Sequence, residues 1–555
     1  MSRQAAHKRK SDPVRGGPGI ARSKRARPKG TPRSVRNPSG SGNGSTRKFD
    51  RIIVIRDPIH KDISIGPVQA AIIDTPVFQR LRYIRQTGLL HFVFPGAVHT
   101  RFSHSLGTMH LARRVFANLF DDYRQPVAGA SRCEAVQYVG TVFETAALLH
   151  DLGHCAFSHS IENVLVQGRP FFPPMAEIVT AWNDPKLTSW WEARLAAKDL
   201  TIPSRTEHEQ VGLLMMGVLF GDRYPQVGEA VRSVLTADPD NFADDVRAMV
   251  IGEMPMSTKF RGCAAKITKR FTQSTVKVAD AARAEQLMSA LHTLISGTLD
   301  VDRMDYLLRD SLHTGAPYGL YDLDVLTHSL ALHAVQDELG SRIVLALRSR
   351  AAGALDDMLW GRYQLFSQVL NHKTNVMLNA LLAEAIPQAI QDSLNTNLGQ
   401  PRRFDDFVLF TDDLVMSAVT RACLLRGAAD RAYEHALVRR LVPAYLGQVR
   451  LQGTDTDDAL VRTERERLAA ELGVDVADIR EWRARSDLLK GGGLPYVLRK
   501  NRIGGGVHLL APGQQGAYQI MEWTSSGELP AKVELMHFFV GRDILTRQNA
   551  KRVSA

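Results

Sequence analysis

Apolar residues recur at three- and four-residue intervals along most of the chain, the spacing that places them on one face of an α-helix. In residues 105–119 this pattern passes through Leu106, Met109 and Phe116. The same spacing predicts further helices over residues 139–150, 207–220, 282–311, 352–392, 413–450 and 461–487. We therefore expect a mainly α-helical protein.

Two stretches favour strands instead. Residues 51–57 (RIIVIRD) are short and β-branched, which predicts a strand or hairpin. Residues 491–540 are rich in Gly and then alternate apolar with polar positions, as in Val507–Leu510 and Val533–Phe539. We expect two or more strands near the C-terminal end of the chain.

Two further segments interrupt or vary the helical pattern. Residues 165–205 contain five prolines and three tryptophans, which predicts an insertion between helices, either a lid over a site or an addition packed on the surface. Residues 465–484 have the spacing of a helix-turn-helix with Gly473 near the turn. An ordinary pair of antiparallel helices accounts for that spacing as well and is the more frequent arrangement.

The chain has 555 residues and a formal net charge of +12, but the charge is unevenly placed. Residues 1–50 hold 14 Lys and Arg against two Asp, so the remainder of the chain is neutral overall. Residues 1–48 have almost no large apolar side chains and cannot bury enough surface to fold, so we expect a disordered basic arm. It is either a tether for nucleic acid or a nuclear address, or a solubilising tail.

The four cysteines are widely spaced without a CxxC pair, which argues against a disulfide framework or a thiolate zinc site. No apolar run is long enough to span a membrane, and no signal-peptide pattern follows the basic N-terminus. We expect no membrane association and a cytoplasmic location, with a nuclear one possible in a eukaryote because of the basic arm.

Histidines are concentrated in one part of the chain. Seven of the 18 fall between His91 and His159, where a uniform spread would give about two. The densest part is His150–His159, which holds three of them and Asp151 in ten residues. Single histidines of this kind are often hydrogen-bonded core residues, but a cluster of seven favours a site.

A second block adds carboxylates. Asp300–Asp310 is dense in acids, yet apolar residues run through it, so part of the block must face inward. A hydrolytic metal site needs imidazoles and carboxylates with positions left for water and substrate. His104, His150, Asp151 and an acid of this block are therefore candidates to meet in one site.

Several ordered blocks of the sequence resemble a known family, the HD-domain deoxynucleoside triphosphate triphosphohydrolases. The resemblance covers about residues 50–385. The family includes the deoxyguanosine triphosphate enzymes and the dNTPase with a sterile alpha motif. It is carried by the blocks Asp57–His60, Ile73–Gln86, Phe94–Gly96, Arg101–Gly107, Leu149–His159 and Asp300–Asp310. It implies a helical HD-domain phosphohydrolase core followed by a helical and partly β C-terminal region.

The resemblance also implies roles for individual residues. Four would hold a divalent metal such as iron or manganese, with magnesium accompanying the nucleotide: His104, His150, Asp151 and Asp302. His159, oriented by Glu162, would transfer a proton at the leaving group. His154 and His208 complete this catalytic set and are similar to residues that bind the phosphates.

The remaining site residues would hold the substrate. Arg101, Arg303 and Arg362 resemble the family's phosphate-binding arginines, and Tyr306, Asp310 and Gln86 resemble the residues at the deoxyribose. The chain departs from the sterile-alpha-motif relative at Thr87 and at Leu370-Asn371, positions near the sugar and base.

Three residues resemble the activating nucleotide site of that relative, namely Asp74, Gln79 and Arg82. They imply activation by GTP or a dNTP. The same Asp-Thr-Pro stretch can also serve as a structural helix cap.

The resemblance implies an enzyme that converts dNTPs to deoxynucleosides and inorganic triphosphate and so controls dNTP pools, acting as a homo-oligomer. We expect a basic arm over residues 1–48, a catalytic domain over 49–395 with its insertion at 165–205, and an oligomerisation or regulatory region over 396–555. Two alternatives stay open: an HD phosphohydrolase acting on another nucleotide, and a nucleic-acid-binding regulatory protein that uses the basic arm.

Overall fold

The computed structural model describes most of the chain after residue 52. The described ranges are residues 53–120, 131–162, 164–166, 168–198, 206–252, 254–269, 282–337, 340–391, 399–426, 442–451, 457–487, 494–500, 507–510 and 532–554. The chain divides into two units, residues 1–45 and 46–555, and every described residue belongs to the second. The expected disordered arm over residues 1–48 therefore lies outside the described residues.

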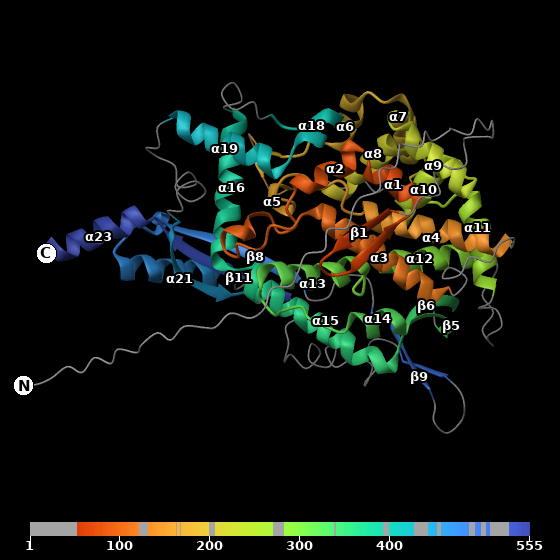
Figure 1. Ribbon diagram of the computed structural model, residues 1–555. Coiled ribbons are helices and arrows are strands. Elements are labelled where there is room, and N and C mark those ends of the chain that lie inside the picture. Colours follow the sequence, from red (N-terminus) through yellow and green to blue (C-terminus); the bar gives the residue numbers. More distant parts are fainter. Residues whose placement is uncertain are drawn as a thin grey trace, which may run out of the picture. The chain divides into compact units, whose positions relative to one another are not determined.

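The second unit begins with a hairpin and continues as a bundle of helices (Figure 1). Strands β1 (Ile53–Asp57) and β2 (Lys61–Ile65) pair antiparallel, which confirms the strand or hairpin predicted at this point. The helices that follow are α1 (Pro67–Ile73), α2 (Pro76–Gln79), α3 (Arg101–Leu119), α4 (Ser131–Leu149), α5 (His159–Glu162), α6 (Met175–Trp182), α7 (Pro185–Ala197), α8 (His208–Phe220), α9 (Pro225–Leu235), α10 (Pro239–Ile251), α11 (Thr258–Thr268), α12 (Ala282–Ser296), α13 (Val301–Thr314) and α14 (Leu323–Ser329).

The apolar stripes read from the sequence form the core of this bundle. On α3, Leu106, Met109 and Phe116 are buried, and α4 packs beside α3 with its own stripe, Val142 and Ala146 included, equally buried. Burial of such faces is the main source of helix stability in a folded protein. The mainly α-helical class is confirmed.

The predicted helix over 282–311 is two helices, α12 and α13. The Asp300 side chain accepts the backbone N–H of Arg303 at 2.7 Å and so caps the first turn of α13, while Gly315 ends the helix with φ of 71°. An N-cap residue has extended backbone geometry, so a capping aspartate and a continuous helix exclude each other. This break brings the acids of α13 to the start of a helix.

The predicted helix over 352–392 is also interrupted. It consists of α15 (Ala352–Leu365), a π-helical turn at Phe366–Leu370 and α16 (Lys373–Gln391). Between α14 and α15 lies a hairpin that was not predicted, formed by β5 (Leu330–Asp337) and β6 (Gly340–Arg348). After α16 come α18 (Phe404–Leu409) and α19 (Asp412–Arg426).

Two helix predictions near the C-terminus are wrong at their C-terminal ends, and residues 427–441 of the first range lie outside the described residues. The range 413–450 ends in strand β7 (Ala444–Arg450), and the range 461–487 contains α21 (Asp457–Leu472) followed by strand β8 (Ile479–Asp487). Both strands pair antiparallel with β11 (Lys532–Val540), and this long-range pairing overrides the local helical spacing. The helix-turn-helix and the helical pair considered for 465–484 are both wrong.

The expected C-terminal strands are present. Strand β9 (Tyr496–Lys500) pairs with β10 (Val507–Leu510) and, in parallel, with β6, while β11 lies at the centre of the sheet β7-β11-β8. The chain ends in α23 (Arg542–Ser554). Phe404, Phe407 and Val415 belong to the same hydrophobic core as the helices of the bundle.

The insertion predicted at 165–205 forms a short hairpin, β3 (Leu165–Val166) with β4 (Arg169–Pro170), and then α6 and α7; residues 199–205 lie outside the described residues. Trp182 and Trp191 are buried, and Trp182 packs edge-on against Phe404. The described part is therefore a packed addition. Within the described ranges, no helix is both long enough and apolar enough to cross a membrane.

Candidate metal centre and active site

Three of the four predicted metal ligands converge at the ends of helices. His104 lies in the first turn of α3, His150 directly follows α4, and Asp302 lies in the first turn of α13. One donor atom from each lies within 4.8 Å of the others. The Nε2 atom of His104 is 3.0 Å from an Asp302 carboxylate oxygen, and that of His150 is 3.7 Å from the same oxygen.

The fourth residue, Asp151, borders the same point. Its Oδ2 lies 3.5 Å from His104 Nε2 and its Oδ1 lies 3.4 Å from His150 Nε2. Asp151 also forms an ion pair with Arg101. The four predicted ligands are thus brought together by the consecutive helices α3 and α4 and by α13, which lies far from both in sequence.

The hydrogen bonds of the two imidazoles show that both rings are oriented as metal ligands are. His150 Nδ1 donates to the carbonyl of Ala147 at 2.8 Å, and His104 Nδ1 donates to Asp305 at 2.7 Å. The Nε2 atoms of both rings are buried and face the carboxylates of Asp302 and Asp151, and no described residue completes a hydrogen bond with them. A ligating histidine typically donates its other N–H to a carbonyl or carboxylate, which leaves a lone pair for the metal. The donor set therefore fits a divalent cation.

Behind His104 lies a buried ion network that was not predicted from the sequence. Asp305 accepts from His60 Nε2 at 2.6 Å and from Arg309 Nε at 2.8 Å, besides His104. Arg309 is fully buried and also donates to Asp57 at 2.8 Å. The sequence contains features that could have indicated this network. Asp57 and His60 lie in the first block of the resemblance, and Asp305 and Arg309 are four residues apart in its last block, a spacing that allows a pair on one helix face.

The electrostatics of the centre follow from this crowding of acids and imidazoles. Burial disfavours a charged His104, but the carboxylates of Asp302 and Asp305 outweigh it and raise the pKa of His104 to about 10. Burial likewise opposes ionisation of Asp151, yet Arg101 and the neighbouring histidines hold its pKa well below the usual range. The carboxylates are thus ionised at neutral pH, the form that binds cations, and a metal that binds beside them would displace the Nε2 proton of His104.

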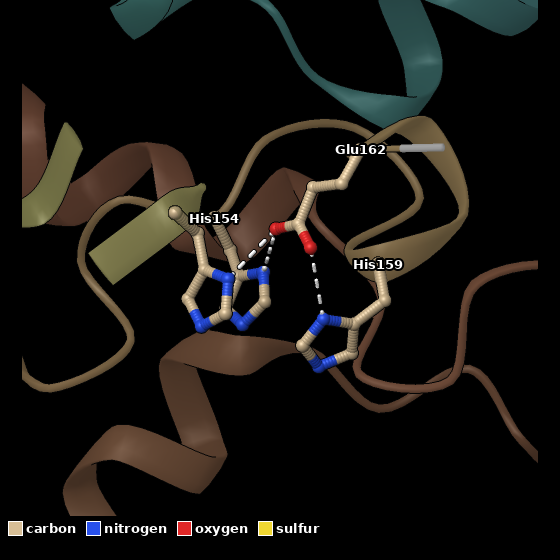
Figure 2. A group of neighbouring side chains, drawn as sticks. His154, His159 and Glu162 are labelled. Atoms are coloured by element: carbon tan, nitrogen blue, oxygen red, sulfur yellow. Dashed lines mark hydrogen bonds and ion pairs between the residues drawn. The ribbon is translucent and has the colours of Figure 1, made fainter. Parts of the chain in front are cut away.

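A second group surrounds the carboxylate of Glu162 (Figure 2). Glu162 accepts from His159 Nδ1 at 3.1 Å and from His208 Nδ1 at 2.7 Å, and His154 Nδ1 lies 3.8 Å away. The pairing of His159 with Glu162, three residues apart, was predicted. It directs the Nδ1 proton to the carboxylate and leaves Nε2 of His159 for chemistry.

His154 and His208 are stacked, with ring centroids 3.6 Å apart, but their environments differ. Burial and the nearby Arg101 hold the pKa of His154 well below its ordinary value. Burial acts in the same direction on His208, but Glu162 outweighs it and raises the pKa of His208. The stack therefore combines a neutral imidazole with one that holds its proton more firmly.

Glycines allow this close approach. A side chain at Gly153 would overlap the backbone of α8 at His208 and Gly212. Because Gly153 lies in the loop between His150 and His154, its lack of a side chain lets α8 carry His208 against that loop.

Both groups open into one cavity of about 380 Å³. This volume is within the range of small-molecule sites. Ten of the predicted site residues line it: Gln86, Arg101, His150, Asp151, His154, His159, His208, Asp302, Tyr306 and Asp310. The lining also includes Thr87 and Leu370, at the two positions where the sequence departs from the relative. Asn375 lines the cavity as well, and its buried side-chain oxygen has no hydrogen-bond partner among the described residues.

Two predicted phosphate ligands lie behind this lining. Arg303 pairs with Asp300 at 2.6 Å, and Arg362 donates to the Tyr306 hydroxyl at 3.2 Å. Asp310 accepts from His99 at 2.8 Å, a contact that the sequence reading missed. Arg362 in this structure therefore positions a residue of the cavity wall.

The three residues considered for an activator lie apart from the cavity lining. Arg82 donates to Gln79 at 2.7 Å, and Asp74 is exposed at the end of α1. Thr75, between them, caps α2 through its hydroxyl. The structure thus contains the helix cap considered as the alternative, next to an exposed polar group.

Comparison with known proteins agrees with this geometry. Residues 101–210 match the HD domain model and contain His104, His150, Asp151 and the whole Glu162 group. The chain is 27% identical over 348 residues to deoxynucleoside triphosphate triphosphohydrolase SAMHD1 of Homo sapiens, covering 61% of this chain and 45% of that protein. It is 26% identical over 385 residues to the uncharacterized protein MJ1154 of Methanocaldococcus jannaschii, covering 68% and 60%.

Two solved structures share the fold. A hypothetical protein from Aquifex aeolicus aligns with a TM-score of 0.56 at 20% identity, over 90% of this chain and 99% of that one. A phosphohydrolase from Bacteroides thetaiotaomicron aligns with a TM-score of 0.54 at 21% identity, over 88% and 100%. The chain spans about half the length of the curated relatives it matches.

The match over residues 101–210 and the histidine–aspartate centre identify an HD domain, a domain of metal-dependent phosphohydrolases. Beyond this domain, the chain is similar to deoxynucleoside triphosphate triphosphohydrolases such as the human relative.

Proposed function

We propose that this chain is a metal-dependent triphosphohydrolase that converts dNTPs to deoxynucleosides and inorganic triphosphate. The observation that carries the proposal is the joining of two groups in one cavity, a divalent-metal donor set and a Glu162-oriented histidine. The name of the human relative supports the substrate class. A cavity lined by Arg101 and several histidines suits a polyanion.

His104, His150, Asp151 and Asp302 would hold the metal, which when bound lowers the pKa of water toward neutrality and supplies a nucleophile. The bond that breaks joins the α-phosphorus to the 5′-oxygen of the sugar. His159 would donate its Nε2 proton to that oxygen, since Nδ1 is engaged by Glu162 at 3.1 Å. His208, with its raised pKa, would contribute positive charge beside the phosphates.

The opposite end of the cavity would hold the nucleoside. Tyr306 and Asp310 are one turn apart on α13 and both line the cavity, as Gln86 does from another loop. Arg362 and His99 hold two of these side chains from behind. We assign Gln86, Tyr306 and Asp310 to binding of the deoxyribose. Arg101 and Arg303 are assigned to the triphosphate and to the side chains that hold it.

Regulation and assembly extend the proposal. Asp74, Gln79 and Arg82 would receive a GTP or dNTP activator at the exposed end of α1 and α2. We propose a homo-oligomer in which residues 396–555 contribute to assembly or regulation, a cytoplasmic or nuclear role in dNTP-pool control, and nucleic-acid contact through the basic arm.

The test is product analysis. Purified protein with Mn²⁺ is incubated with the four dNTPs, with and without GTP, and with a panel of nucleoside monophosphates and cyclic nucleotides. We expect equimolar triphosphate and deoxynucleoside from at least one dNTP. His159→Asn should lower kcat by about 10²- to 10⁴-fold, whereas His328→Asn, on an exposed face of α14, should not. Release of a product other than triphosphate, or no triphosphate from any of the four dNTPs, would contradict the proposed activity.

A further inference from the structure

A buried carboxylate outside the matched HD domain holds two loops of the cavity. Asp412 is the first residue of α19, and its side chain is completely buried. Its Oδ1 accepts the backbone N–H of Phe157 at 2.8 Å, and its Oδ2 accepts the backbone N–H of Arg85 at 3.1 Å. One side chain thus connects two loops that are some 70 residues apart in sequence.

Both loops carry residues that line the cavity. Arg85 precedes Gln86 and Thr87, and Phe157 precedes Ser158 and His159. The two loops also touch each other, because the Ser158 hydroxyl donates to the carbonyl oxygen of Arg85 at 3.4 Å. A shift of either backbone would therefore move groups that face the substrate.

The loop at Phe157 has a conformation that needs support. Phe157 and Ser158 have φ values of 58° and 53°, in the left-handed region. For residues other than glycine this conformation costs roughly 1 kcal/mol or more each. The Asp412 bond to Phe157 and a second backbone bond, from Ala156 N–H to the Phe410 carbonyl at 3.3 Å, tie this loop to the start of α19.

The left-handed pair has a direct effect on the chemistry of the site. Ser158 accepts from Arg101 Nε at 2.8 Å, and Arg101 in turn pairs with Asp151. His159 follows immediately and begins α5. The backbone turn at Phe157–Ser158 therefore sets the direction of both Arg101 and His159.

Burial by itself favours the neutral form of the side chain at position 412. Burial raises the pKa of Asp412 to about 6, although the backbone N–H groups and Arg85, whose guanidinium lies 3.5 Å away, favour the charged form. The neighbouring Asp413 is largely exposed and adds to the rise. An ionised Asp412 thus lowers stability at neutral pH while it provides two hydrogen-bond acceptors.

We propose that Asp412 is a positioning residue that fixes the Arg85–Gly88 and Phe157–Ser160 loops in their working geometry, so that the start of α19 is part of the active-site scaffold. What those loops do in the reaction rests on the proposed function. The positioning itself is a property of the backbone and can be measured without substrate.

The test compares Asp412→Asn with Asp413→Asn. The amide at 412 keeps the size of the side chain but presents an N–H group to one of the two backbone donors. Amide hydrogen exchange of the full-length proteins should show loss of protection at Arg85 and Phe157 in Asp412→Asn and none in Asp413→Asn. With dNTP and Mn²⁺, kcat of Asp412→Asn should fall about 10- to 100-fold, with a smaller change in KM and unchanged metal content.

The outcomes distinguish the positioning role of Asp412 from the proposed hydrolysis of dNTPs. Unchanged exchange at both amides, or a kcat within about twofold of wild type per folded and metal-loaded molecule, would overturn the positioning role. If Asp412→Asn does not fold, Asp412→Glu keeps the charge and moves it by one methylene, and an unaltered kcat in that variant would overturn the role as well. If the wild type hydrolyses no dNTP, the proposed function fails, but the exchange result still decides the role of Asp412.

Discussion

The Nδ1–H of His104 donates to the carboxylate of Asp305 at 2.7 Å, and this one bond determines which ring nitrogen faces Asp302. Asp305 does not line the cavity among the described residues, but it sits between His104 and the buried Arg309. The orientation of a proposed metal ligand is thus fixed by a residue three positions after another ligand on α13.

Asp305→Asn should weaken metal binding. An asparagine cannot keep the charge that orients His104, and loss of such an outer partner typically lowers metal affinity about 10- to 100-fold. Competition with a chelator measures the change. Asp324→Asn is the matched control, because Asp324 is an exposed acid paired with Arg114 on the surface. Equal affinities in the two variants would remove Asp305 from the account of the centre.

Arg309→Met should destabilise the protein strongly. Arg309 is the cation between Asp57 and Asp305, all three buried, and its removal leaves both buried carboxylates without their guanidinium partner. Breaking such a pair costs about 3–5 kcal/mol in the free energy of unfolding. Urea denaturation measures it. The control is Arg467→Met, on the exposed face of α21 beside Glu464, which should leave the midpoint unchanged. A similar midpoint for both variants would contradict the prediction.

Two glycine substitutions should act in opposite directions. In Gly153→Ala the new methyl group would overlap the backbone of α8, so we expect a loss of about 1–3 kcal/mol and lower activity through His208. Gly262 lies exposed on α11 with open space around it, so Gly262→Ala should stabilise by about 0.4–1 kcal/mol. Thermal melting compares them. If Gly153→Ala left the melting temperature unchanged, α8 would be able to move away from the loop between His150 and His154.

The pH dependence of stability should reveal Asp245 on α10. Burial raises its pKa to about 6 from 3.8, against hydrogen bonds from Tyr138 and Ser257 that lower it. The folded state therefore binds this proton more tightly than the unfolded state, and the contribution of Asp245 to stability falls as pH rises from about 4 to 6. The loss amounts to about 3 kcal/mol. Asp245→Asn has no carboxyl to titrate at this position. The free energy of unfolding of the variant should therefore rise relative to that of the wild type as pH rises through this window.

Asp240→Asn provides the control for that series. Asp240 lies on the same helix but is exposed and faces Lys186 at 3.9 Å. Its free energy of unfolding should run parallel to that of the wild type between pH 4 and 7. A parallel curve for Asp245→Asn as well would mean that this carboxyl does not titrate in the window.

The sequence predicted the fold well where local spacing and burial agree. The stripe through Leu106, Met109 and Phe116 predicted α3, because a helix that must bury one face shows this pattern directly. Residues 479–487 show the limit: they have helical spacing but lie in β8, because β11, some 50 residues further on, pairs with them. Such non-local pairing leaves little trace in a short window of sequence.

The site shows the same division. His150, Asp151 and Asp302 could be recognised because they recur in ordered blocks of a known family. Asp305 lies within those blocks, yet its role depends on contacts with His60 and Arg309 that only the packing reveals. Asp412 lies outside every block, and its importance comes from accepting two backbone N–H groups, which carry no sequence signal.

The most direct test of the central claim is triphosphate release from a dNTP as a function of bound metal. Protein stripped by a chelator should release no triphosphate, and stoichiometric Mn²⁺ should restore release in the wild type but not in His150→Ala, whose folding is checked by circular dichroism. Release by metal-free protein at the full rate, or an undiminished rate in folded His150→Ala, would contradict the assignment of His104, His150, Asp151 and Asp302 as a catalytic metal centre.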